Sequence, residues 1–197
     1  MKTDEELAQK SIGGEDAAYQ ELMRRNMRQA FNLARLYIKT DEDAEDVVQE
    51  SFFKAWKHLK RFDPKKRFSP WLLTIVRHTA LDFIKKKKAV SFSALDANGA
   101  HDDEGDGPAF ADSLSDAEPL ADALFEQAET AAEVAQALDI IHPDHRTVLT
   151  LHYHDEMTFE EIADVMQKPM NTVKSWHRRA LVKLKGHLHQ KRAQLRR

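Results

Sequence analysis

The sequence lacks several features whose absence narrows its class. It has no cysteine, which excludes a disulfide framework and thiolate metal sites and fits a reducing compartment such as the cytoplasm. Six glycines and six prolines in 197 residues are too few for a many-turned β-sandwich or for a glycine-rich phosphate loop. No apolar run approaches the roughly 18 residues of a membrane span, and the first residues lack the apolar segment of a signal peptide. We therefore expect a helical, cytoplasmic protein without membrane insertion.

Charge is segregated along the chain, although the net charge is only −3. Residues 1–88 carry five more basic than acidic side chains, and residues 146–197 carry six more. Between them, residues 89–145 hold 14 acidic residues and no lysine or arginine. Two basic segments that flank an acidic one indicate binding to a polyanion such as nucleic acid.

A segment rich in Asp, Ser, Gly and Ala separates two helical patterns. Residues 91–118 contain too few large apolar side chains to offset the entropy cost of ordering, so we expect a flexible acidic linker there. On both sides of it, apolar residues recur every three or four positions, which predicts amphipathic helices. The predicted fold is all-α, with two small helical domains at residues 1–90 and 119–197. The linker is interpreted either as a solvating tether or as a mask over the basic domains.

Three helices are predicted in the first domain. An apolar stripe over residues 19–38 defines the first helix. Thr40 is placed to cap the second, whose apolar side runs over residues 44–59. The third begins near residues 69–70, where proline suits the first helical position, and ends in the lysine run at 85–88. Three amphipathic helices of this kind can share one core.

The second domain contains the pattern of a helix-turn-helix. Thr158 and the glutamate three residues later form a capping box that opens a short helix. A turn over residues 167–170 follows, and a longer basic helix over 173–188 is capped by Asn171 or Thr172. A short capped helix, a tight turn and a longer basic helix are typical of DNA-binding domains.

The second helix of such a motif lies in the major groove, with its first residues near base edges. Residues 168–197 contain ten lysines and arginines and no acidic residue, which favours binding to phosphates. Val173, Ala180 and Leu184 are spaced to face the core. The outward-facing candidates for contacts with double-stranded DNA are Asn171, Thr172, Lys174, Ser175, Trp176, Arg178 and Arg179.

The loop and third helix of the first domain interleave cations with aromatic rings. Binding of single-stranded DNA uses this combination, because cations follow the phosphates while rings stack on exposed bases. Trp71 is equally well interpreted as a core residue. The candidates for melted DNA are Lys65, Lys66, Arg67, Phe68, Trp71, Arg77, His78 and Lys85.

The second helix also carries a polar stripe opposite its apolar side, with Phe53 between the two. An aromatic residue beside exposed polar groups is typical of a protein interface, although the stripe alone also fits an ordinary solvated surface. The candidates are Asp43, Asp46, Gln49, Glu50 and Phe53.

Motifs for catalysis or metal binding are missing from the sequence. It has no nucleophile elbow, no P-loop and no pair of carboxylates with catalytic spacing. Four histidines fall within residues 142–154, but they lack the spacing of a zinc motif and are interpreted as surface or turn residues. We expect no catalytic residue, no metal and no cofactor.

Three stretches together resemble bacterial RNA polymerase sigma factors of the extracytoplasmic-function (ECF) type. TFEEIADVMQKPMNTVKSWHRRALVKL at 158–184 is similar to their C-terminal helix-turn-helix. DAEDVVQESFFKAW at 43–56 resembles their polymerase-binding segment, and residues 71–88 resemble their promoter-melting segment. The resemblance covers about residues 15–88 and 120–190. It implies a promoter-specificity subunit whose partners are core RNA polymerase and promoter DNA, with an anti-sigma factor as a further partner known in the family.

The resemblance also implies roles for the candidate residues. The stripe on the second helix would dock on the helical clamp of the polymerase's large subunit, and the loop before Trp71 would capture a flipped base of the minus-ten element. The second domain would read the minus-thirty-five element, and the acidic linker would thread the positively lined RNA path of the polymerase. The sequence departs from the family at Gln167, the usual turn glycine, at Trp176, the usual arginine, and at His78, often asparagine. These departures leave the promoter sequence open.

Two other functions are weighed against this one. A stand-alone helix-turn-helix regulator would leave the DAEDVVQE segment without a role. A sigma-like decoy that only titrates an anti-sigma protein would not need the basic recognition helix.

Overall fold

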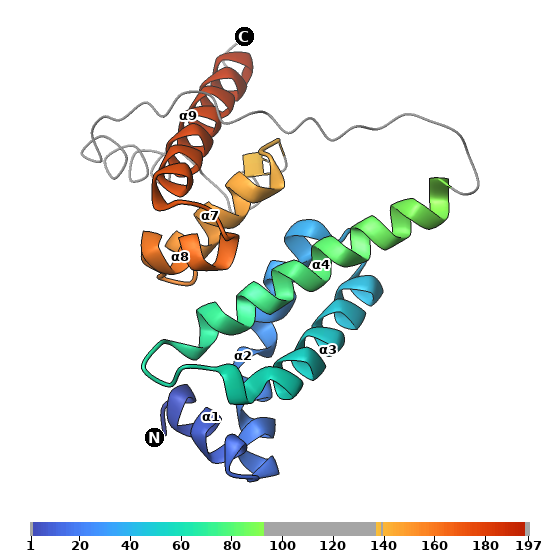
Figure 1. Ribbon diagram of the computed structural model, residues 1–197. Helices are drawn as coiled ribbons and strands as arrows, with labels where there is room; N and C mark the ends of the chain where they lie inside the picture. The colour runs from blue at the N-terminus through green and yellow to red at the C-terminus, as the bar shows by residue number, and fades with distance from the viewer. Residues whose placement is uncertain (1, 93–136, 139, 196–197) are drawn as a thin grey trace. The chain divides into compact units, whose positions relative to one another are not determined.

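The computed structural model describes residues 2–92, 137–138 and 140–195, and the chain divides into two compact units (Figure 1). All regular secondary structure of the described residues is helical, which confirms the predicted fold class. Residues 93–118 of the predicted linker lie outside the described residues, and so does the start of the second domain at residue 119. Residues 91–92 belong to the end of a helix.

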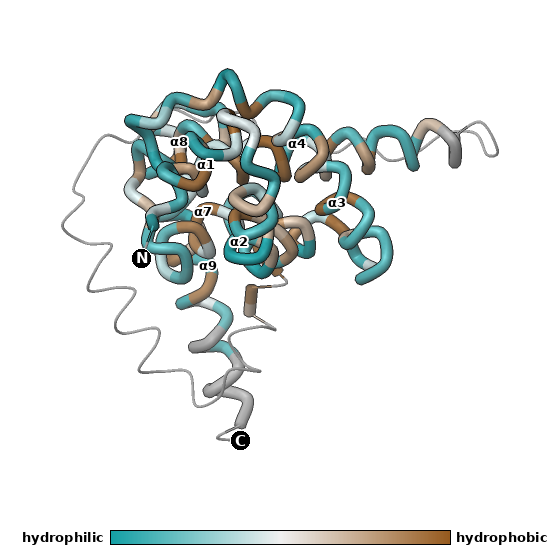
Figure 2. Tube along the Cα trace, turned by 90° about the horizontal axis from the view of Figure 1, so that it is seen from below, coloured by the Kyte–Doolittle hydropathy of each residue, from teal (hydrophilic) through white to brown (hydrophobic). Residues whose placement is uncertain are grey.

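The described residues of the first unit form four α-helices and one 3-10 turn. They are α1 (Asp4–Ile12), α2 (Asp16–Tyr37), α3 (Asp41–His58), η1 (Leu59–Arg61) and α4 (Phe68–Phe92). Helices α2, α3 and α4 pack against one another, and α1 packs mainly on α2. Apolar and polar residues alternate along them, as Figure 2 shows, and the apolar side chains of Leu22, Phe52 and Leu72 are fully buried. The three predicted helices share one core, as expected.

Local sequence explains where α3 begins and how it is tied to α2. Thr40 Oγ1 accepts a hydrogen bond from the backbone N–H of Asp43, and the acidic first turn complements the helix dipole. The Tyr19 hydroxyl on α2 donates to the backbone carbonyl of Phe52 on α3. Burial raises the pKa of Tyr19, so its hydroxyl stays protonated and remains a donor.

The structure corrects three details of the predicted first domain. Helix α1 was not predicted, although Thr3 and Glu6 form a capping box at its start. Helix α4 continues through the lysine run to Phe92. Met27 and Trp56 fall within the predicted apolar ranges 19–38 and 44–59 but are 41% and 40% exposed. The Trp56 ring still contacts the ring of Tyr19, with centroids 4.7 Å apart.

The second unit contains α7 (Pro143–Tyr153), α8 (Phe159–Met166) and α9 (Met170–Leu195). Its core includes Ile141, Leu149, Ala180 and Leu184, which brings α7 and α9 together. The capping box at the start of α8 is confirmed, because Thr158 N–H donates to the Glu161 carboxylate at 2.9 Å and Glu161 N–H donates to Thr158 Oγ1 at 3.2 Å. The predicted helix-turn-helix is therefore present as α8, a short turn and α9.

The turn between α8 and α9 requires a left-handed residue, and glutamine occupies that position. Gln167 has φ 51°. The N–H of Lys168 donates to the carbonyl of Ala163 at 3.2 Å, and the N–H of Gln167 donates to the carbonyl of Asp164 at 3.3 Å. This pair of bonds is a Schellman ending of α8. Helix α9 then begins at Met170, so the prediction that Asn171 or Thr172 caps it is wrong, and both lie in its first turn.

Replacing Gln167 with glycine is expected to stabilise the second unit by about 0.5–1 kcal/mol, because glycine adopts positive φ without the steric cost that a Cβ imposes. The gain is reduced by the greater freedom of glycine in the unfolded chain. Thermal unfolding followed by circular dichroism measures the change. Gln167→Ala is the control, since alanine keeps the strained Cβ and should give no gain. Equal stability of the glycine and alanine variants would contradict the expectation.

Candidate functional site

Helix α9 has one buried face and one cationic face. Val173, His177, Ala180 and Leu184 are buried at helical spacing, which confirms the predicted inward positions 173, 180 and 184. The predicted DNA-contacting residues lie on the remaining surface. Asn171, Arg178 and Arg179 are exposed, whereas the side chains at 172 and 174–176 are half-buried.

Two side chains on this face contact rings or cations of neighbouring elements. Trp176 lies 5.5 Å from the ring of His145 on α7, and Lys168 Nζ lies 5.9 Å from the Trp176 ring. Lys174 Nζ lies 6.0 Å from the ring of Phe159, the first residue of α8. Trp176 therefore joins the start of α7 to α9, and only part of its ring remains accessible to solvent.

Behind this face, His177 occupies an aromatic cluster that joins α7, α8 and α9. Its ring centroid lies 5.2 Å from that of His152, 5.5 Å from that of Tyr153 and 5.2 Å from that of Phe159. Its Nε2 is 3.0 Å from the Tyr153 hydroxyl. Burial, together with the neighbouring His152, lowers the pKa of His177 to about 4. The imidazole is therefore neutral at physiological pH. No sequence pattern pointed to this structural role of His177.

In the first unit, the cationic loop of residues 62–67 connects η1 to α4. Aromatic rings pack together at its base, and cations lie at its tip. Phe62 and Phe68, at its two ends, are buried with ring centroids 5.4 Å apart. The half-buried ring of Trp71 contacts both, at 5.4 Å and 5.6 Å. At the start of the loop, Asp63 accepts hydrogen bonds from the next residues of the turn. The tip carries three exposed cationic residues, Lys65, Lys66 and Arg67.

Two side chains expected to face DNA instead face the core of the first unit. Phe68 is 1% exposed and belongs to the aromatic base of the loop. Arg77 is 7% exposed, and its Nε donates to the Tyr37 hydroxyl at 3.2 Å. Among the other candidates on α4, His78 is half-buried and Lys85 is exposed.

The polar stripe of α3 is exposed around Phe53. Asp46, Gln49 and Glu50 are exposed, and Phe53 is 57% exposed with Lys57 Nζ 4.2 Å from its ring centroid. An exposed aromatic ring of this size beside polar groups is typical of an interface anchor.

Asp43, the first residue of the stripe, is held in place by α4. Its carboxylate lies 2.7 Å from Lys87 Nζ. Hydrogen bonds from Lys87 and from Thr40 hold the pKa of Asp43 below its ordinary value, so the carboxylate stays charged.

Comparison with known proteins decides the family. The Sigma-70 region 2 model matches residues 22–90, and the Sigma-70 region 4 model matches residues 137–186. RNA polymerase sigma-H factor of Pseudomonas aeruginosa is 30% identical over 176 residues, covering 89% of this chain and 88% of the relative. ECF RNA polymerase sigma-E factor of Salmonella typhimurium is 31% identical, covering 88% and 87%. The chain belongs to the ECF sigma factor family.

Solved structures of other sigma factors share the fold of this ECF sigma factor. CnrH, in complex with the cytosolic domain of CnrY, matches with a TM-score of 0.64 and 24% identity, covering 95% of this chain and 97% of CnrH. The sigma factor RpoE of Bartonella quintana, in complex with the anti-sigma factor NepR, matches with a TM-score of 0.61 and 20% identity, covering 87% and 96%. At these identities, the likeness concerns the fold.

The structure also brings together residues of this sigma factor that the sequence analysis did not connect. A groove of about 520 Å³ between α3 and α4 is lined by Asp43, Asp46 and Glu50 from α3 and by Asp82, Phe83 and Lys86 from α4, among others. Helical spacing identifies the outward face of each helix but not which faces lie side by side. Asp82 and Phe83 therefore carried no usable signal in the sequence.

The described part of the chain holds neither a metal-binding cluster nor a membrane-spanning helix. In residues 2–92 and 137–195 apart from 139, no three histidine or acidic side chains are gathered as a metal site would require. Over the same part of the chain, no helix combines the length and apolar character needed to cross a membrane.

Proposed function

We propose that this chain binds core RNA polymerase through the α3 surface around Phe53 and directs it to promoters that carry two sequence elements. The polymerase supplies the chemistry in the cytoplasm, and this chain supplies recognition and strand opening. Both units contribute a cationic surface on a rigid helical support. The observation that carries the proposal is that a region 2 unit and a region 4 unit occur in one chain, each with such a surface.

The second unit would read the upstream, minus-thirty-five element. Arg178 and Arg179 lie exposed on the surface of α9 opposite its buried residues, where a helix in the major groove meets bases and phosphates. The half-buried Lys174 stands one turn before Arg178 and brings a third positive charge to the same part of the helix.

The first unit would open and hold the minus-ten element. The exposed cations at residues 65–67 can follow the phosphates of a separated strand, and Trp71, at the base of the loop, is the half-buried ring nearest to them along the chain. Flipping a base out of the duplex costs a few kcal/mol, which contacts in a preformed loop can offset.

Transcription in vitro tests this function directly. Core polymerase with the chain is expected to select, from a library of random promoters, sequences sharing one upstream and one downstream element at fixed spacing. Core polymerase alone should show no such selection. Absence of stable core binding, or unchanged promoter choice, would contradict the proposal and leave a stand-alone regulator or a decoy as the better explanation.

Binding of the chain to core polymerase, measured with the same components, tests the α3 surface. Phe53→Ala is expected to weaken core binding about tenfold without changing the unfolding temperature, because an exposed interface anchor adds binding energy but little stability. Met27→Ala is the matched control, since Met27 is also an exposed apolar residue of the first unit but lies on α2. An equal effect of both variants would show that Phe53 is not an anchor.

A further inference from the structure

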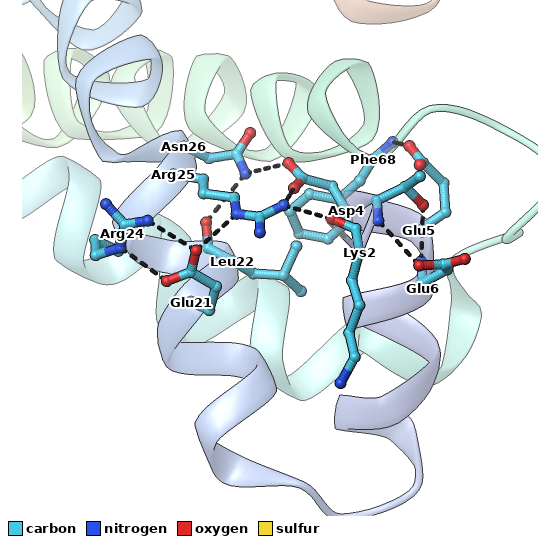
Figure 3. A network of polar contacts seen from close by, with 11 residues as sticks. Lys2, Asp4, Glu5, Glu6, Glu21, Leu22, Arg24, Arg25, Asn26 and Phe68 are labelled. Atoms are coloured by element: carbon cyan, nitrogen blue, oxygen red, sulfur yellow. Dashed lines mark hydrogen bonds and ion pairs between the residues drawn. The ribbon is translucent and has the colours of Figure 1, made fainter.

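The start of α4 is capped by a side chain of α1, which lies 63 positions earlier in the sequence. The first N–H groups of a helix have no partner within the helix, and a side-chain acceptor just before it usually binds one of them. Arg67 precedes α4 and has no acceptor to offer. Instead, Glu5 Oε1 on α1 accepts the hydrogen bond of the Phe68 N–H at 3.0 Å. Figure 3 shows this bond beside the contacts that fix α1.

The carboxylate of Glu5 is suited to this role. Partial burial on its own would raise the pKa of Glu5, but the hydrogen bond from Phe68 and the nearby positive charge of Arg67 contribute to a net lowering. A negative charge at the start of a helix also complements the helix dipole. Glu5 therefore stays ionised at neutral pH and binds the end of the loop as an anion.

Helix α1 is itself fixed firmly enough to hold the end of the loop at Phe68. Asp4 Oδ1 binds Arg25 Nη1 at 3.1 Å, and Asp4 Oδ2 binds Asn26 Nδ2 at 2.8 Å (Figure 3). Arg25 also binds Glu21 at 2.8 Å, and Asn26 is buried. Since α2 packs on α3 and α4, these contacts tie the first turn of α1 to the core of the unit. A carboxylate on α1 can therefore hold Phe68 in a fixed position.

The point that Glu5 holds is the junction of loop and helix. Phe68 is buried against Phe62 and Trp71, so its position sets where the loop ends and where the Trp71 ring lies. Helix α1 also contacts η1, at the start of the same loop. The elements on both sides of the cationic loop thus contact α1, which lies outside the region 2 match at residues 22–90.

We propose that α1 is a positioning element for the loop of residues 62–67 and that Glu5 sets the precision with which this loop recognises bases of the melted strand. This inference rests on the proposed function of the loop in binding the minus-ten element. Glu5 would not touch DNA. It would act by fixing the N-terminus of α4 and, through Phe68, the rings beneath the loop.

The test uses the full chain bound to core polymerase and a single-stranded oligonucleotide of the minus-ten element selected by the wild type. Affinity is compared between this oligonucleotide and versions with one base replaced. Glu5→Ala is expected to lower the ratio of the two affinities about fivefold. This is the factor that corresponds to the free energy of one helix cap. Glu5→Gln keeps an acceptor but loses the charge, and a smaller loss is expected. Glu15→Gln, with the same charge change on an exposed side chain before α2, should match the wild type.

The outcomes separate positioning from simple stabilisation. Reduced discrimination with unchanged affinity for core polymerase and for upstream duplex DNA supports the proposal. Wild-type discrimination in Glu5→Ala, or a loss that only parallels weaker core binding, overturns it. If Glu5→Ala does not fold, Glu5→Gln decides by the same two measurements. A wild-type complex without any discrimination would instead refute the proposed function of the loop.

Discussion

Arg178→Ala is expected to weaken binding of the polymerase complex to its selected upstream element by about 5- to 160-fold, corresponding to about 1–3 kcal/mol for a specific base contact. Arg178 is exposed on α9, one turn after Lys174 and next to the buried His177. A guanidinium there can donate two hydrogen bonds to a guanine edge, and alanine can donate none. Binding to a duplex in which the contacted base pair is replaced should change much less.

Comparison with a second cation on the same helix distinguishes base reading from phosphate binding. Lys185 is exposed about two turns further along α9, beyond the segment that normally enters the groove. Lys185→Ala should therefore weaken binding to all sequences alike and reduce the salt dependence by about one charge. A uniform loss for Arg178→Ala would reassign it to the phosphates. Lys174→Ala, measured in parallel, extends the test to the preceding turn.

Local chemistry made most of the fold predictable. Thr40 and Thr158 were recognised as helix starts because their hydroxyls suit the free N–H groups of a first turn, and the structure shows both bonds. The register of α9 was also predictable, since residues at 173, 180 and 184 repeat at helical spacing and are buried. The family resemblance places Gln167 where a turn glycine is usual, and the structure shows at this position the positive φ that favours glycine.

Contacts between distant segments were not predictable from one sequence. The bond from Phe68 to Glu5 joins residues 63 positions apart, and no periodicity relates them. Arg77 is a different case, because its charge suggested exposure while its register suggested burial. It follows Leu73 by one turn and precedes Ala80 by three residues, both fully buried, so the helical position prevailed over the charge. The Tyr37 hydroxyl gives the buried guanidinium an acceptor.

The same distinction applies to the candidate site: features on one helix were predictable, and features formed by two helices were not. Helical spacing identified the exposed cations of α9 and the polar stripe of α3, since each lies on one helix. It did not identify the groove between α3 and α4, because Asp82 and Lys86 come from a different helix than Asp46. The acidic segment that separates the two units is described by its sequence alone, and its role as tether or mask stays a prediction.

The second unit is expected to lose stability as the pH falls from about 6.5 towards 4, because of His177. Above pH 6.5 this imidazole is neutral in both folded and unfolded chains. Below that, the unfolded chain takes up a proton that the folded unit excludes, since burial and His152 lower the pKa of His177 to about 4. The free energy of unfolding should fall by at most about 1.4 kcal/mol for each pH unit in this window. The loss should be complete once the pH is below 4.

Amide hydrogen exchange at Val173 and Ala180 reports on the second unit alone, because both residues are buried in α9. Their protection is expected to drop between pH 7 and pH 5 after correction for the intrinsic exchange rate.

In His177→Phe the drop in protection should shrink, because phenylalanine fills the cluster of Tyr153 and Phe159 without a titratable group. The variant loses the hydrogen bond to the Tyr153 hydroxyl. His58→Phe is the control, since His58 is exposed in the first unit. If His177→Phe keeps the full acid sensitivity, His177 is not the group responsible for it.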